Sequence, residues 1–291
     1  MTQSARLSSA APHESFVLIT GAAGGLGKAL AVECASRGWN LVLTDLRGGP
    51  LEVLAAGLRA SYQIEVLVHP GDLTDPASRA ALFDWIRERG LRFWSLFNVA
   101  GLDYEGMFYD CTRQQIRTIL RLNIEGTLEM IHAMLDFRDP HVTFRIINVA
   151  SLAAFFPMPV KATYAASKRF LLDFSLALRE EVRSLGATVT VLCPAGMPTT
   201  PECFDAIDAQ GLIGQLTTQN IGAVAAETID AAQRGSAVVI PGVLNRALHF
   251  FGAMIPPRLV AKLVANRWKS AHHRRHQPAG GSANRMINAV E

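Results

Sequence analysis

The stretch Phe16-Val-Leu-Ile-Thr-Gly-Ala-Ala-Gly-Gly-Leu-Gly27 decides the fold of this chain. Its first five residues form a short apolar run that is typical of a buried strand, and a helical pattern follows its last glycine. Gly21 permits the tight turn from strand to helix. Gly25 allows a pyrophosphate to approach the backbone, and Gly27 allows the helix to lie close on the sheet. The stretch therefore predicts the first βα unit of a dinucleotide-binding domain.

An acidic residue, Asp45, ends the next predicted strand, 18 residues beyond Gly27. A carboxylate at this place accepts hydrogen bonds from both ribose hydroxyls of an adenosine and repels a 2′-phosphate, which favours NAD(H) over NADP(H). Two alternatives stay open. Asp45 could instead cap a turn at Gly48-Gly49-Pro50, and the neighbouring Arg47 could contact a phosphate.

Strands and helices keep alternating along the chain. Further strands are predicted at 64–68, 94–98, 144–149, 187–193 and 237–240, and further helices at 76–89, 112–135, 161–185 and 221–234. Repeated βα units of this kind predict a single α/β domain with a doubly wound parallel sheet.

A second motif follows the predicted strand at 144–149. Ser151 stands just beyond the end of this strand, whereas Tyr164 and Lys168 stand four residues apart on one face of the helix predicted at 161–185. The three side chains are therefore expected to meet at the carboxyl edge of the sheet, where open α/β sheets bind ligands.

These three residue types favour proton transfer to a carbonyl oxygen. A free tyrosine has a pKa near ~10, and a neighbouring lysine cation lowers that pKa by favouring the phenolate. A serine hydroxyl holds the reacting oxygen by a hydrogen bond. The alternative is a surface Tyr–Lys pair with an unrelated serine. Lysine is scarce in this chain, with five residues against 23 arginines, which weighs against that alternative.

Taken together, the motifs resemble the short-chain dehydrogenase/reductase superfamily over residues 16–242. Thr20–Gly27 matches its TGxxxGxG pattern, and Asn98-Val-Ala-Gly101 matches its NNAG pattern with valine in the second place. Asp72-Leu73 matches its adenine-contacting aspartate, although Asp72 could also cap the following helix. The resemblance implies a seven-stranded Rossmann sheet with helices on both faces. It also implies reversible hydride transfer between a nicotinamide and an alcohol/carbonyl pair.

The resemblance implies roles for the catalytic tetrad Asn123, Ser151, Tyr164 and Lys168. Tyr164 would exchange the proton, while Lys168 would lower the pKa of Tyr164 and hold the nicotinamide ribose. Ser151 would fix the substrate oxygen. Asn123 would order a water that links Lys168 to solvent, unless its amide is a hydrogen-bonded packing residue. No metal is implied. The implied cofactor-binding residues are Gly21, Gly25, Leu26, Gly27, Asp45, Asp72, Leu73, Asn98, Ala100, Gly101, Tyr164, Lys168, Pro194, Met197 and Thr199.

Three loops are expected to border the substrate cleft, at 102–109, 152–160 and 200–220. Two alanines beside it, Ala154 and Ala195, replace glycines of the family pattern, so each adds a methyl group. The loops carry almost no cationic residues, and their bulky apolar side chains favour a bulky apolar ketone or alcohol, with a steroid as the leading candidate. The alternative is ordinary loop packing. The residues concerned are Met107, Phe108, Tyr109, Phe155, Phe156, Met158, Phe204, Ile207 and Leu212.

The predicted function is therefore an NAD(H)-dependent oxidoreductase acting on a ketone or secondary alcohol, with hydroxysteroid dehydrogenase activity favoured. A 3-oxoacyl reductase or another carbonyl reductase is the alternative within the enzyme class. The alternative outside that class is an NAD-sensing binding protein. An intact Tyr164–Lys168 pair favours the enzyme, because a sensor does not need it.

Charge and composition divide the chain. Residues 1–14 are predicted to be a flexible segment, 15–242 the catalytic domain, 243–269 an amphipathic helical extension broken at Pro256-Pro257, and 270–291 a disordered tail. Residues 231–291 hold nine Arg or Lys and one acid, whereas residues 1–230 hold 19 bases and 24 acids. The basic extension could cap the substrate cleft, pack on another subunit or touch an anionic membrane surface.

The remaining composition bears on location and partners. No signal peptide, transmembrane run or nucleic-acid-binding motif is recognisable. The four cysteines show no metal or redox spacing, which predicts buried, reduced thiols in a cytoplasmic protein. The resemblance implies a homodimer or homotetramer paired through the helices near 112–135 and 162–185.

Overall fold

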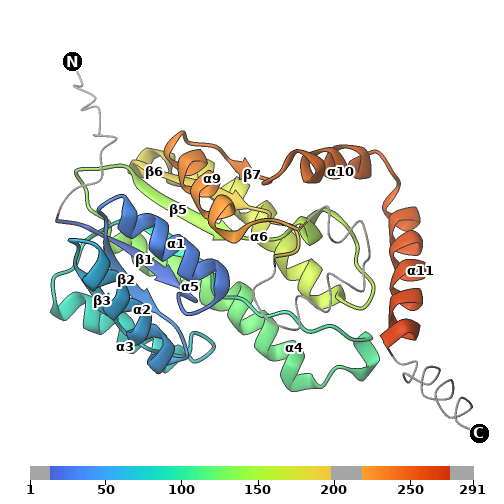
Figure 1. Cartoon of the computed structure of the whole chain (residues 1–291), viewed down its shortest axis with the longest axis horizontal. Helices are drawn as coiled ribbons and strands as arrows, with labels where there is room; N and C mark the ends of the chain where they lie inside the picture. The colour runs from blue at the N-terminus through green and yellow to red at the C-terminus, as the bar shows by residue number, and fades with distance from the viewer. Residues whose placement is uncertain (1–13, 198–217, 276–291) are drawn as a thin grey trace, which may run out of the picture.

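Seven parallel strands form one sheet in the spatial order β3-β2-β1-β4-β5-β6-β7, as predicted (Figure 1). The structure is a computed structural model, and it describes residues 14–197 and 218–275. The order reverses between β1 and β4, so the carboxyl ends of these strands open a crevice. The strands are β1 Phe16–Thr20, β2 Asn40–Thr44, β3 Val66–Val68, β4 Phe93–Asn98, β5 Phe144–Val149, β6 Ala187–Leu192 and β7 Val238–Val239.

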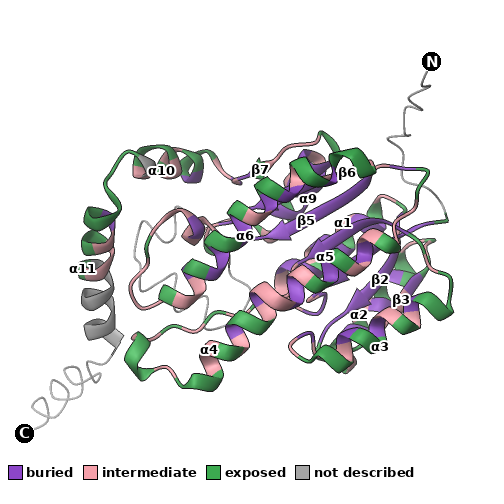
Figure 2. Ribbon diagram, turned by 180° about the vertical axis from the view of Figure 1, so that it is seen from behind, coloured by how far each residue is buried: buried purple, intermediate pink, exposed green. Residues whose placement is uncertain are grey.

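Helices cover both faces of the sheet (Figures 1 and 2). Helices α1, α2 and α9 contribute to the apolar core on one face, and α3, α5 and α6 to the core on the other. The helices are α1 Gly25–Ser36, α2 Gly48–Ser61, α3 Pro76–Glu88, α4 Arg113–Leu120, α5 Thr127–Asp136, α6 Ala162–Glu181, α9 Ile221–Gln233, α10 Val243–Ala253 and α11 Pro257–Arg275. Shorter helical turns are η1 Phe108–Asp110, η2 Arg121–Gly126, η3 Leu152–Phe155 and η4 Val182–Leu185.

Strand β1 illustrates how the sequence builds these two cores. Val17 and Ile19 point into the core with α1, α2 and α9, whereas Phe16 and Leu18 point into the opposite core. All four side chains are buried. A strand buried on both faces needs apolar residues at every position rather than at every second one, which is why this run contains no polar alternation.

The glycine-rich turn after β1 requires its glycines. Gly21 has a φ of +63°, and a side-chain carbon there would lie 2.7 Å from the Ala100 Cα atom. A side-chain carbon at Gly27 would lie 2.2 Å from the Gly21 carbonyl oxygen. Both positions therefore exclude any larger residue, and α1 lies against the turn as the sequence predicts.

The helix predicted at 112–135 is interrupted. A capping box between Thr112 and Gln115 starts α4, but residues 121–126 form a π turn before α5 continues the helix. Gly126 ends this turn, where a side-chain carbon would lie 2.8 Å from the Leu73 carbonyl oxygen. A π turn adds only one residue to the helical period, so the apolar spacing did not reveal it. Such turns often occur at functional sites.

Two other predicted boundaries are wrong. The strand predicted at 64–68 is shorter, because pairing with β2 involves only residues 66–68. The second helix of the extension continues to Arg275, so residues 270–275 are helical rather than part of a disordered tail. No proline or glycine interrupts the sequence between Arg258 and Arg275, which explains the longer helix. The predicted flexible residues 1–13 and the rest of the predicted tail, 276–291, lie outside the described residues.

Helix α10 of the extension packs beside the turn that follows β5. The Phe155 and His249 rings lie 3.9 Å apart between centroids. Gly252 faces Phe156 so closely that a side-chain carbon there would lie 2.4 Å from the ring. The predicted break at Pro256-Pro257 is confirmed, since α10 ends at residue 253 and α11 begins at residue 257.

The state of the cysteines and the length of the helices relate to the predicted cellular location of the protein. Cys34 and Cys193 are buried and free, but Cys111 is partly exposed, contrary to expectation, because it lies on a surface loop. Cys203 lies outside the described residues. Within residues 14–197 and 218–275, none of the helices is both long and apolar enough to cross a bilayer.

Arg79 on α3 is fully buried, and its charge is paired. The Arg79 guanidinium donates to the Leu73 carbonyl oxygen at 2.7 Å and forms ion pairs with Glu125 and Glu129 at 2.6 Å each. Replacing Arg79 with methionine leaves that buried carbonyl without its donor, so we expect a loss of about 2–3 kcal/mol in the free energy of unfolding.

Urea unfolding followed by circular dichroism measures this loss. The matched control is Arg87→Met on the same helix, because the Arg87–Asp84 pair is 65% exposed on both sides. We expect the control to change the free energy of unfolding by less than about 0.5 kcal/mol. Equal losses in the two variants contradict the assigned role of Arg79.

Candidate active site

A cavity of about 820 Å³ lies along the carboxyl edge of the sheet. It extends from the glycine-rich turn after β1, past the loops after β2 and β4, to the residues after β5 and β6. Most predicted site residues line this one cavity, so the fold brings them together. They are Gly21, Gly25, Leu26, Gly27, Asp45, Asp72, Leu73, Ala100, Gly101, Ser151, Tyr164, Lys168, Pro194 and Met197.

Three predicted site residues are not among those that line it. Thr199 lies outside the described residues. The Asn98 amide donates to the Asn148 amide oxygen at 2.9 Å and so links β4 to β5. Asn123 is fully buried and is not among the residues that line the cavity. Cofactor contact by Asn98 and Thr199 stays a prediction.

The Asn123 side chain anchors the loop after β4. Its Oδ1 accepts from the Leu102 backbone N–H at 2.9 Å, and its Nδ2 donates to the Leu102 carbonyl oxygen and to Ser167 Oγ, each at 3.0 Å. The amide is thus hydrogen-bonded on both sides, as the packing alternative expected. The ordering of a water beside Lys168 stays a prediction.

The Lys168 ammonium is buried at the centre of the site. Its Nζ donates to the Val149 carbonyl oxygen at 2.8 Å and lies 5.7 Å from the centroid of the Tyr164 ring. A side-chain carbon at Gly101 would lie 3.1 Å from Nζ, so the glycine leaves room for the ammonium. Burial lowers the pKa of Lys168 from its ordinary value of 10.5 to about 8, and the negative charge of Asp103 opposes this shift.

Ser151 lies two residues beyond the end of β5, as predicted. Its Oγ accepts a hydrogen bond from the Ala153 backbone N–H at 3.1 Å. The hydroxyl hydrogen remains available to a substrate oxygen, because an accepted bond uses only a lone pair. Ser151, Tyr164 and Lys168 line the same cavity, so a carbonyl group placed there can meet a hydroxyl, a phenol and an ammonium.

At the other end of the cavity, the Asp45 carboxylate lines the cavity and also accepts hydrogen bonds from neighbouring protein groups. Its Oδ2 accepts from the Ala23 N–H of the glycine-rich turn at 3.0 Å. Its Oδ1 accepts from the backbone and the side chain of Arg47, at 3.0 and 3.2 Å. A carboxylate has about four acceptor sites, so these bonds leave capacity for ribose hydroxyls. Arg47 also lines the cavity and offsets part of the negative charge.

Asp72 does not cap α3, so the alternative role of Asp72 as a helix cap is excluded. Asp75 occupies the cap position and accepts from the Ala77 N–H at 3.1 Å. Asp72 accepts from the Thr74 N–H at 2.8 Å, and it lines the cavity together with Leu73. The Leu73 backbone is held from behind by Arg79, so this part of the wall is fixed by buried contacts.

The residues of the first helix fit a dinucleotide. Gly24 caps α1 and has no side chain to satisfy the first N–H groups of the helix. These groups and the dipole of the helix are suited to a pyrophosphate, and the glycine cradle permits close approach. In the described parts of the chain, no cluster of three or more His, Cys, Asp or Glu side chains is arranged to hold a metal ion.

A charged group beside Tyr164 was missed from the sequence. Lys161 pairs with Asp103 and lies 3.5 Å from Glu105, and its Nζ lies 6.0 Å from the centroid of the Tyr164 ring. Lys161 and Asp103 both line the cavity. Lys161 lies one residue beyond the predicted loop 152–160, so the cavity holds a cation although the predicted loops contain none. The available signal was a second lysine, seven residues before Lys168, in a chain poor in lysine.

The apolar lining of the substrate end also differs from prediction. Phe156 and Met158 line the cavity, whereas Phe155 packs on His249, and Phe108 and Tyr109 are 63% and 81% exposed. Met107 is not among the lining residues either. Unpredicted apolar lining residues are Leu102, Leu152 and Leu248. The predicted residues Phe204, Ile207 and Leu212 lie outside the described residues.

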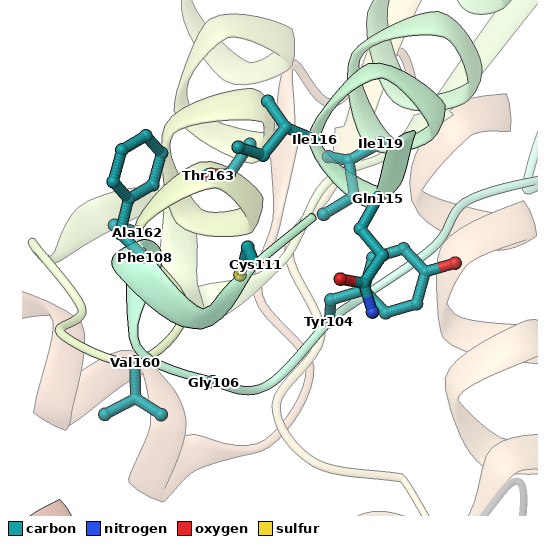
Figure 3. A pocket seen from close by; sticks show the side chains of 10 residues that line it. All are labelled: Tyr104, Gly106, Phe108, Cys111, Gln115, Ile116, Ile119, Val160, Ala162 and Thr163. Atoms are coloured by element: carbon teal, nitrogen blue, oxygen red, sulfur yellow. The ribbon is translucent and has the colours of Figure 1, made fainter. Parts of the chain in front are cut away.

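The loop that carries Phe108 borders a second, much smaller hollow. Figure 3 shows side chains of this loop, of α4 and of the start of α6 around a hollow. The hollow has a volume of only about 10 Å³, about that of one water. Phe108 borders this small hollow and is not among the residues that line the large cavity.

The comparisons with known proteins agree with this geometry. A family model described as short chain dehydrogenase matches residues 15–203. The chain belongs to the short-chain dehydrogenase family. Members of this family are oxidoreductases with a nicotinamide cofactor, which agrees with the glycine cradle and the Tyr164–Lys168 pair.

Two curated relatives illustrate the range of this family. The chain is 34% identical over 183 residues to a sulfoacetaldehyde reductase of Chromohalobacter salexigens, covering 61% of this chain and 70% of the relative. It is 29% identical over 188 residues to 17-beta-hydroxysteroid dehydrogenase type 3 of Homo sapiens, covering 63% of this chain. The match spans only 59% of that relative's length.

Solved structures of this family have the same fold. A short-chain dehydrogenase from Sphingobium yanoikuyae in complex with NADPH has a TM-score of 0.69 and 26% identity, covering 93% of this chain and 99% of that one. A bulky-bulky ketone specific alcohol dehydrogenase from Comamonas testosteroni has a TM-score of 0.68 and 25% identity, covering 84% of this chain and 96% of that one.

The buried ammonium makes the stability of this short-chain dehydrogenase depend on pH. The pKa of Lys168 is about 8 in the folded protein and close to 10.5 when the chain unfolds, so the unfolded state binds more protons between these values. The cost of burying the cation is fully present below pH 8 and is relieved as the pH rises. Relative to a Lys168→Met variant, we expect the free energy of unfolding to rise by about 2 kcal/mol between pH 8 and pH 10.

Urea titrations of both proteins at several pH values measure this difference. The control is Lys28→Met, because Lys28 is exposed on α1. We expect this control to follow the parent protein at every pH. A difference between parent and Lys168→Met that stays flat or falls with pH contradicts the burial of the cation.

Proposed function

We propose that this chain is an NAD(H)-dependent oxidoreductase that interconverts a ketone and a secondary alcohol of a bulky apolar substrate, with a steroid favoured. The observation that carries the proposal is one cavity that joins the glycine cradle to Ser151, Tyr164 and Lys168. The Lys168 ammonium lies 5.7 Å from the Tyr164 ring, which is close enough to stabilise a phenolate.

In the proposed reaction, the nicotinamide cofactor supplies the hydride when it is bound. Tyr164 donates its phenolic proton to the carbonyl oxygen during reduction and takes it back during oxidation. Lys168 stabilises the phenolate that remains, and Ser151 holds the reacting oxygen by a hydrogen bond. Lys168 is fixed for this task by the Val149 carbonyl group, so it does not need to be ordered during the reaction.

The preference for NAD(H) rests on Asp45. Its carboxylate is buried at the end of β2 and lines the cavity where an adenosine ribose is expected. A carboxylate favours free ribose hydroxyls and disfavours a 2′-phosphate. Arg47 weakens this preference, because its guanidinium pairs with Asp45. The structure from Sphingobium yanoikuyae holds NADPH, so the family fold accepts both forms.

The apolar side of the cavity supports a bulky substrate. Leu152, Phe156, Met158 and Leu248 lie there, and two relatives are named for a steroid and for bulky ketones. A 3-oxoacyl substrate is the second candidate within the same chemistry.

We further propose a cytoplasmic homo-oligomer. Free, buried thiols such as Cys34 support a reducing compartment. Pairing through α4 and α6 is supported by three apolar side chains that are 39–42% exposed on these helices, namely Leu120, Phe170 and Leu176.

A Tyr164→Phe variant tests the chemistry. It removes the proton that the carbonyl oxygen receives, and we expect kcat to fall about 10³-fold while NADH still binds. The measurement is loss of NADH absorbance with a panel of ketosteroids, 3-oxoacyl esters and sugars. Tyr109→Phe is the control, because Tyr109 is 81% exposed; we expect its kcat to stay within about twofold.

Two results contradict the proposal. Turnover by Tyr164→Phe at the rate of the parent excludes the proton role of Tyr164. Binding of NADH in a fluorescence titration without turnover of any compound in the panel favours the NAD-sensing alternative.

An Asp45→Asn variant tests the cofactor preference. The asparagine oxygen still accepts the Ala23 N–H bond that holds the glycine-rich turn, but the negative charge is gone. We expect the ratio of kcat/KM for NADPH to that for NADH to rise about tenfold or more. The surface control Asp84→Asn leaves the ratio unchanged. A parent enzyme that prefers NADPH overturns the assignment of Asp45.

A further inference from the structure

Exposed apolar side chains are concentrated on α10 and the first half of α11. Of 19 large apolar side chains that are exposed in the described parts of the chain, nine lie within residues 243–263. Six of these nine are more than half exposed, namely Val243, Phe250, Phe251, Met254, Leu259 and Leu263. We name residues 243–266 the α10–α11 surface. Apolar side chains at this density on a solvent-exposed surface indicate an interaction site.

The α10–α11 surface is also basic. Its sequence contains Arg246, Arg258 and Lys262 but no aspartate or glutamate, whereas residues 1–230 hold five more acids than bases. Arg246 pairs with Glu227 on the neighbouring α9 at 3.3 Å. Arg258 and Lys262 are exposed beside the apolar side chains. The partner of this surface must therefore be apolar and anionic at once.

Helices α10 and α11 lie away from the centre of the sheet. Helices α10 and α11 lie at the end of the molecule opposite α2 and α3 in both views (Figures 1 and 2). Within the part of the chain that the structure describes, neither helix is long and apolar enough to cross a bilayer.

We propose that the α10–α11 surface binds an anionic lipid bilayer, with its apolar side chains in the interface and Arg258 and Lys262 on the lipid phosphates. A bilayer interface offers both apolar chains and negative charge. A second copy of this chain is less suited, because a symmetric contact brings the same basic residues of both copies together.

The α10–α11 surface is continuous with the cavity. Leu248 of α10 lines the cavity and is 39% exposed. Gly252 packs on Phe156, which lines the cavity as well. Binding to a bilayer therefore places the apolar end of the cavity next to the lipid. This follows from the position of α10 and does not depend on which substrate is turned over.

Co-sedimentation of the full chain with vesicles tests the proposal. We expect binding to vesicles of equal parts phosphatidylglycerol and phosphatidylcholine, and binding weaker by about tenfold or more to phosphatidylcholine alone. Raising the salt to about 1 M is expected to weaken the first binding, because it screens the basic residues.

Two double variants separate the apolar and the charged contributions. Phe250→Ser with Met254→Ser, and Arg258→Glu with Lys262→Glu, are each expected to weaken binding to the mixed vesicles about tenfold or more. The matched controls are Val53→Ser with Leu185→Ser, and Arg87→Glu with Arg183→Glu. All four control residues are exposed on other elements, and we expect their variants to bind as the parent does. Circular dichroism checks that every variant is folded.

Three outcomes overturn the proposal. The first is absence of binding to the mixed vesicles. The second is binding that the charge variant and salt leave unchanged. The third is a dimer in sedimentation velocity that Phe250→Ser with Met254→Ser dissociates while vesicles bind nothing, which assigns the α10–α11 surface to a second copy. All three readouts are independent of catalysis, so they do not bear on the proposed reaction.

Discussion

A buried ammonium sets the geometry of this active site. Lys168 reaches the end of β5, bonds the Val149 carbonyl oxygen and stands beside the Tyr164 ring. Its burial has a cost, since the pKa of Lys168 falls to about 8. Two neighbouring residues accommodate the buried ammonium. Gly101 leaves room for Nζ, and the Asn123 amide fixes the loop that follows Gly101.

The reversal of strand order between β1 and β4 connects the two halves of the site. It places the glycine-rich turn and the loop after β4 in contact, as the closeness of Gly21 to the Ala100 backbone demonstrates. Arg79 holds the Leu73 backbone from the other side. The proposed cofactor-binding wall is therefore built from backbone held by buried contacts, which is the arrangement that precise placement of a dinucleotide requires.

The extension adds features that the family core does not supply. Helix α10 closes one side of the cavity through Leu248 and packs on the turn after β5, while its outer side leaves apolar groups exposed next to basic ones. The Lys161–Asp103 pair, which also lines the cavity, joins the loop after β4 to the start of α6. In the proposed function, the substrate would contact loops and an added helix, whereas the residues proposed for proton transfer belong to the core.

The sequence by itself determined the βα order, the parallel sheet, the glycine-rich turn and the positions of Ser151, Tyr164 and Lys168, because each depends on local spacing or on a backbone that only glycine permits. Tertiary structure alone decided the π turn at Asn123, the exposure of Phe108, the contact of α10 with the cavity and the pairing of Lys161 with Asp103. These features depend on packing between segments far apart in the chain, and local periodicity carries no information about such contacts.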